Sequence, residues 1–188
     1  MKAKSRLNRR EFIRLAASAV AVGSSVSCGK VISPWRSLTP DEADTLTSLC
    51  NQIVPEDQDP GAASAGVVNY IDVQLASRLK RMKKVYRAGI AELNGNSFEK
   101  YGKRFASLSD QQQIEFLTAI DSDQAWKGTS LRKFFRIVID HTMQGFYGDP
   151  RHGGNRNRAS WAMLRLAYPP VRGRFHEEAN SAINSKLS

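Results

Sequence analysis

Apolar residues at helical spacing are the feature that most constrains this chain. Aliphatic and aromatic side chains recur three and four positions apart, and no segment shows the alternating pattern of a half-buried strand. Spacings of three and four place side chains on one face of a helix, and that face must be buried against another element. The sequence therefore predicts an all-α fold, a single compact helical domain of about five or six helices around one core.

The first expected helix has clear signals at both ends. Thr39 can cap the free amides of a helix start, Pro40 suits the first helical position, and Glu42 completes a capping box. Pro55 ends this helix, and residues 56–66 are polar and rich in turn formers, which predicts a loop.

Further helices follow from the same spacing. Two are expected over residues 67–75 and 78–93, with Asn94-Gly95-Asn96 as the stop of the second. Another begins after Ser109, and we expect its inner side to carry Ile114, Phe116, Leu117 and Ile120.

The last strong pattern begins near Thr129 or Ser130 and is dense enough to predict the most buried helix of the fold. Its apolar residues are Leu131, Phe134, Phe135, Ile137, Val138, Ile139, Met143, Phe146 and Tyr147.

Residues 1–30 are typical of a twin-arginine export signal. Arg9 and Arg10 precede Phe12 and a short, mildly apolar run that is too short to cross a bilayer as a helix. Val26-Ser27-Cys28 resembles a lipoprotein cleavage box, so Cys28 is a candidate for acylation, and cleavage near Ala21 is the alternative. We expect a linker over 31–38 and the helical domain over 39–188. The expected localisation is periplasmic, with contact to a membrane surface only through a lipid or a partner.

Net charge argues against nucleic acid as a partner. The chain carries +10, yet residues 1–30 hold seven basic residues and one acidic residue, which leaves only +4 on the remainder. No known nucleic-acid-binding motif accompanies that surplus. Six basic residues between Arg78 and Arg87 could bind an acidic partner, although a solvated helix face is the simpler interpretation.

The stretch from Gly145 to Asn157 is the most function-like part of the chain. Its glycines and one proline predict a shaped loop, and charged and amide side chains crowd into it. His152 with Asp149 would be a plausible acid and base pair. A structural alternative has Arg151 and Asn155 satisfying carbonyls at helix ends. The three histidines show no spacing accepted for zinc or iron, and no dinucleotide or P-loop pattern occurs, so we expect no cofactor in this chain.

Several of these segments together resemble the gluconate 2-dehydrogenase subunit 3 family. In the C-terminal half the resemblance rests on 145–155, Trp161 and Tyr168-Pro169, and in the N-terminal half on 39–55, 60–67 and 70–75. Two departures occur, because His152 stands where an aromatic residue is expected and Pro170 where a glycine usually closes the turn.

The resemblance implies a non-catalytic small subunit of a periplasmic dehydrogenase. FAD would lie in a large subunit of the glucose-methanol-choline type, and haem c in a third, cytochrome subunit. This chain would supply the signal read by the twin-arginine translocase and stabilise the complex, whose substrate could be gluconate, another sugar or a glycoside. Two alternatives stay open, a stand-alone lipoprotein or binding module, and an enzyme using His152 and Asp149. Our candidate contacts for the large subunit are Phe146, Tyr147, Asp149, Arg151, His152, Asn155 and Trp161.

Overall fold

The computed structural model describes residues 33–166, which contain six α-helices and no β-strand, so the predicted all-α fold is confirmed. The helices are α2 (Pro40–Ile53), α3 (Val67–Ala76), α4 (Lys83–Tyr101), α5 (Asp110–Ser122), α6 (Ser130–Tyr147) and α7 (Ala159–Met163). The predicted export signal at Arg9, Arg10 and Phe12, the candidate acylation site Cys28 and the Tyr168-Pro169 segment lie outside the described residues.

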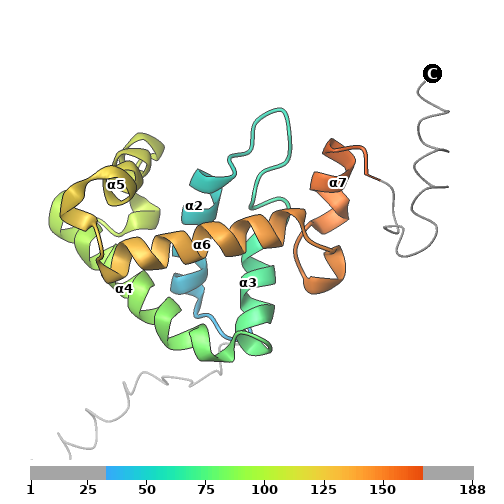
Figure 1. The fold of residues 1–188 in the computed structure, drawn as a ribbon, viewed down its shortest axis with the longest axis horizontal. Coiled ribbons are helices and arrows are strands. Elements are labelled where there is room, and N and C mark those ends of the chain that lie inside the picture. Colours follow the sequence, from blue (N-terminus) through green and yellow to red (C-terminus); the bar gives the residue numbers. More distant parts are fainter. Residues whose placement is uncertain (1–32, 167–188) are drawn as a thin grey trace, which may run out of the picture. The chain divides into compact units, whose positions relative to one another are not determined.

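Helix α6 crosses the other helices and contacts most of them (Figure 1). It packs against α2, α3, α4 and α5 along its length and against α7 near its end. We expected α6 to be the most buried helix, and this is wrong when the fractions of buried residues are compared. Six of ten residues are buried in α3 and seven of 18 in α6. One long side of α6 carries charged residues and faces away from the core.

Local signals at the helix starts are confirmed. Thr39 and Glu42 form a reciprocal capping box at α2, with Pro40 as the first helical residue. Ser109 and Gln112 form the same arrangement at α5. Each box pairs two amides that the helix itself leaves without partners.

The predicted stop at residues 94–96 is wrong, because α4 runs through it to Tyr101 and ends at Gly102 in the left-handed conformation. Asn94 is held inside the helix by distant partners. Its side-chain amide donates to Thr45 Oγ1 over 3.1 Å, and its oxygen accepts from the Phe105 amide over 3.1 Å. These tertiary contacts outweigh the weak helix propensity of the Asn-Gly-Asn sequence.

Three residues assigned to buried faces are exposed. Ile114 is 47% exposed, whereas Phe116, Leu117 and Ile120 are buried as predicted, and on α6 both Met143 and Tyr147 are 42% exposed. A helix pattern locates the apolar stripe but not the edge at which the neighbouring element stops covering it.

The chain enters the domain through a buried carboxylate. Asp72 accepts the backbone amides of Arg36, Ser37 and Leu38 over 2.7 to 3.0 Å, and the Leu38 side chain is buried. A carboxylate that accepts three amides is well satisfied without a cationic partner. The end of the segment expected to be a linker is thus fixed to α3.

Candidate functional site

The predicted loop begins later than the sequence indicated. Gly145, Phe146 and Tyr147 remain in α6, and the chain leaves the helix at Gly148. Glycine is needed at position 145 because a Cβ atom there would lie 2.9 Å from the Tyr70 ring. This glycine marks a close approach between α6 and α3 rather than a break in the helix.

The segment after α6 supplies hydrogen-bond donors to the last carbonyls of the helix, which accept no amide from within the helix itself. Each carbonyl from Gly145 to Gly148 receives a donor from residues 155–161. The pairs are Asn155 N to Gly145 O (2.9 Å), Ser160 Oγ to Phe146 O (2.6 Å), Trp161 Nε1 to Tyr147 O (2.8 Å) and Asn155 Nδ2 to Gly148 O (2.9 Å). We call residues 148–161 the carbonyl-capping loop.

Asn155 is the centre of the carbonyl-capping loop. It is fully buried, and its side-chain oxygen also accepts the Ser160 amide over 3.1 Å. Its backbone has φ 44°, a left-handed conformation that asparagine tolerates better than most residues. Asn155 therefore satisfies helix carbonyls, as the structural alternative predicted, and a contact with another protein is not open to it.

Two glycines let this loop approach the helices. A side chain on Gly154 would lie 2.2 Å from Gly145 O, and Gly153 has φ 99°. The neighbouring helix then holds the loop, since Asn69 Nδ2 donates to Gly153 O over 2.7 Å. The Arg156 amide donates to Ala65 O over 2.8 Å. Glycine is used here for space and backbone freedom, not to cradle a phosphate.

Asp149 and Arg151 pair with each other within the loop. The Arg151 guanidinium donates to both carboxylate oxygens, the shortest distance being 2.6 Å, and the Arg151 amide donates as well. The hydrogen bonds from the Arg151 side chain hold the pKa of Asp149 at about 2. A carboxylate held ionised in this way is a poor base, so the proposed acid and base pair with His152 loses its proton acceptor.

His141, the other histidine among residues 33–166, has a different role. His141 Nδ1 lies 2.7 Å from the Tyr86 hydroxyl, and burial lowers the pKa of His141. Burial raises the pKa of Tyr86, so the pair joins a neutral phenol to a neutral imidazole, and the tautomer of the ring decides which of the two donates. No group of three or more metal-ligating side chains occurs within residues 33–166.

The seven candidate contact residues thus fall into two sets. Phe146, Asn155 and Trp161 are buried, and their polar groups serve the carbonyl-capping loop. Tyr147, Arg151 and His152 are exposed beside it. Only the second set, with the Asp149 that Arg151 holds, presents side chains that another chain could touch.

A groove that sequence analysis did not single out lies between α5 and α6. It has a volume of about 290 Å³, and Gln52 of α2 also lines it. Its lining is mostly apolar and includes Ile114, Leu117 and Asp121 from α5 with Phe135 and Ile139 from α6. We call it the apolar groove.

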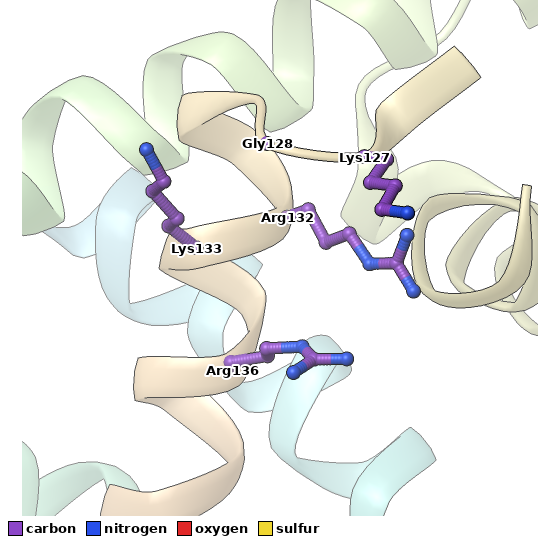
Figure 2. A pocket seen from close by; sticks show the side chains of 5 residues that line it. All are labelled: Lys127, Gly128, Arg132, Lys133 and Arg136. Atoms are coloured by element: carbon purple, nitrogen blue, oxygen red, sulfur yellow. The ribbon is translucent and has the colours of Figure 1, made fainter. Parts of the chain in front are cut away.

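A second hollow of about 300 Å³ lies at the start of α6 and is lined by basic residues and one glycine (Figure 2). Lys127, Arg132 and Arg136 direct their cationic ends to the same side, while Lys133 points the other way (Figure 2). We call it the cationic hollow. Bases four apart at 132 and 136, followed by Ile139 and Met143, were the available sequence signal for this surface.

The comparisons with known proteins give one match. The family model described as gluconate 2-dehydrogenase subunit 3 matches residues 40–166, which span all six helices. Neither a curated protein nor a solved structure matches the chain. Within the described residues, no helix has the length and apolarity that crossing a bilayer requires.

Proposed function

The chain belongs to the gluconate 2-dehydrogenase subunit 3 family, and from this membership we propose that it is the non-catalytic small subunit of an exported FAD-dependent dehydrogenase. It supports the export, assembly and stability of a flavin-bearing large subunit of the glucose-methanol-choline type, and a cytochrome c subunit carries electrons onward. The family match over the helical domain is the observation that carries this proposal.

The sequence before the domain supports the export role. Arg9 and Arg10 precede a short apolar run, which is the pattern of a signal for folded cargo. Folded export is needed when a cofactor is inserted before translocation. The chain would therefore bring a flavoprotein that has no signal of its own through the twin-arginine translocase to the periplasm.

The site geometry supports a binding role more than a catalytic one. Asp149 is held ionised by Arg151, and His141 shares its hydrogen bond with Tyr86, so neither is poised to exchange a proton with a substrate. Two open hollows beside α6 offer surface to another chain instead.

A test uses the full chain in its own host. The protein carries a C-terminal tag, is purified from periplasm and membranes, and is assayed for bound flavin by absorbance and for dye-linked sugar dehydrogenase activity. A stoichiometric flavin-containing chain supports the proposal. A tagged protein that emerges alone and colourless supports a stand-alone module, and turnover by the isolated chain supports an enzyme.

Changing Arg9 and Arg10 to lysine tests the export role separately. Both the small chain and the flavin chain should then stay in the cytoplasm, because the receptor reads the arginine pair as an address. A flavin chain that still reaches the periplasm would show that it travels by another route.

A further inference from the structure

The apolar groove and the cationic hollow meet at Asp121. This residue lines the apolar groove, and its carboxylate lies 3.7 Å from the Arg136 guanidinium, which lines the cationic hollow. Its backbone carbonyl accepts a hydrogen bond from Arg132. The two hollows are therefore parts of one surface along α5 and α6, which we call the α5–α6 surface.

The walls of this surface are fixed in place by contacts beneath it. Gln52, which lines the apolar groove, donates to Gln113 over 3.0 Å, and the Gln113 amide donates to the carbonyls of Phe105 and Leu108. Arg132 caps a carbonyl near the end of α5 and so ties the two helices together. A groove whose walls are held in this way is ready for binding, because little order has to be imposed when a partner arrives.

The apolar part exposes more hydrophobic surface than its helices require. Ile114, which lines the groove from α5, is 47% exposed, and Met143, one helical turn beyond the groove-lining Ile139 on α6, is 42% exposed. Ile139 and Met143 continue the stripe of α6 that begins with Arg132 and Arg136, since spacings of three and four keep them on one face. Adjoining apolar side chains in a groove indicate a contact site, whereas single exposed ones do not.

The positive charge of the cationic hollow indicates that its partner is acidic. Lys127, Arg132 and Arg136 direct their cationic ends to the same side of α6 (Figure 2). The Asp121 carboxylate contacts Arg136, whereas Arg132 binds the Asp121 backbone carbonyl. Arg132 is used in capping α5, but Lys127 takes part in no ion pair within residues 33–166, and Arg136 reaches Asp121 only at 3.7 Å. The hollow keeps a positive excess, which attracts carboxylates and repels other basic surfaces.

We propose that the α5–α6 surface docks an acidic segment of the flavin-bearing large subunit, with an apolar side chain of that segment in the groove between Ile114 and Ile139. This inference rests on the proposed function, and it names the face of the small subunit that contacts the large subunit. The carboxylates of the segment lie against Lys127 and Arg136, and the desolvated apolar contact beside them supplies most of the affinity.

A second copy of this chain is the competing occupant. Its exposed acidic loop at Glu56, Asp57 and Asp59 has the right sign to enter the cationic hollow. The part of the chain after residue 30 carries +4, so two copies repel each other at long range and the charge balance favours a different, acidic partner.

The first experiment reverses charge on the surface. The Lys127→Glu, Arg136→Glu chain is compared with an Arg81→Glu, Lys84→Glu chain. The control makes an equal change of charge on exposed residues, one in the turn before α4 and one in its first turn. Full-length tagged chains are purified from the native host, and the ratio of bound flavin to small subunit is measured. We expect the first pair to lower this ratio about tenfold or more, since like charges facing each other at an interface repel, and the second pair to leave it within about twofold.

The second experiment identifies the segment. A photo-crosslinking amino acid replaces Ile114 or Ile139, with Val85 on α4 as the control position, and crosslinked peptides are identified by mass spectrometry. An acidic peptide of the flavin chain, captured from Ile114 or Ile139 and not from Val85, is the expected result. Capture of residues 56–59 of a second copy would overturn the proposal in favour of self-association.

The outcomes separate the two claims. A wild-type chain that emerges without any flavin protein overturns the proposed function, and this inference with it. If the wild-type chain binds the flavin protein and the Lys127→Glu, Arg136→Glu chain binds it at the same ratio, only the assignment of the α5–α6 surface is overturned.

Discussion

The carbonyl-capping loop and the α5–α6 surface differ in how they use polar groups. The loop crowds glycine, charge and amide into a short stretch, yet its buried Asn155 and Trp161 turn inward to pair helix carbonyls. The α5–α6 surface carries no motif, and its cations and aliphatic side chains remain accessible. A dense polar sequence beside glycines indicates first a backbone that needs hydrogen-bond partners. Side chains are available to bind another molecule only where the backbone hydrogen bonds are already made.

Gly154→Ala is the change that should damage the fold most. The new methyl group would meet Gly145 O at 2.2 Å and Tyr70 Cβ at 3.0 Å, so the loop must move away from α6 and α3. We expect a loss of about 4 kcal/mol in the free energy of unfolding, measured by urea denaturation.

Gly95→Ala is the matched control, because a methyl group there meets nothing within 4 Å. It lies inside α4, where alanine should raise the free energy of unfolding by about 0.5 to 1 kcal/mol. Equal effects of the two glycine changes would contradict the idea that the loop is a packed structural element.

Asn155→Ala should cost about 3 kcal/mol. It leaves Gly148 O and the Ser160 amide without their partner in a buried place, and an unpaired buried polar group costs about 1 to 3 kcal/mol. The measurement is the same urea denaturation. A loss below about 1 kcal/mol would mean that water replaces the amide and that the loop is open to solvent.

The Tyr86–His141 pair should give stability a pH dependence. Burial lowers the pKa of His141 below its usual 6.5, so the unfolded chain binds the proton first as the pH falls. The contribution of His141 to the free energy of unfolding is therefore complete above about pH 6.5, and it declines as the pH falls toward the pKa of His141 in the folded state. His141→Gln should weaken this decline in melting temperature between about pH 7.5 and about pH 5.5. An unchanged decline would assign it to other groups.

Substitutions on the α5–α6 surface should affect stability least. Lys127→Glu and Ile114→Ser alter exposed side chains, and we expect changes within about 0.5 kcal/mol in urea denaturation. Loss of the flavin partner with unchanged stability would complete the contrast with the capping loop. A large loss of stability would show instead that the groove walls belong to the core.

Much of the fold could be predicted because its signals are local. The capping residues Thr39 and Ser109 act on amides three positions away, so the sequence alone places both helix starts. The stop expected near Asn94 was wrong, because Thr45 and Phe105, distant in sequence, hold that residue in the helix. The family resemblance seen in the sequence is confirmed by the match over residues 40–166.

The site could be predicted only in part. The loop after α6 stands out by its composition, and Asn155 was expected to serve helix carbonyls in one of the two interpretations. The same interpretation gave that role to Arg151, whose guanidinium is seen to pair with Asp149. Ile114 was placed in the core, and its exposure is part of the groove that the sequence did not reveal.

The sequence by itself determined the all-α class, the capped starts of α2 and α5, and the family, because these depend on spacing and on neighbours within one or two turns. The tertiary structure alone decided which polar side chains are used internally and which face outward. Asp72 shows the reason, since its carboxylate binds amides 34 to 36 residues away. A hydrogen-bond donor or acceptor has no preference among equally good partners until folding brings one of them within reach.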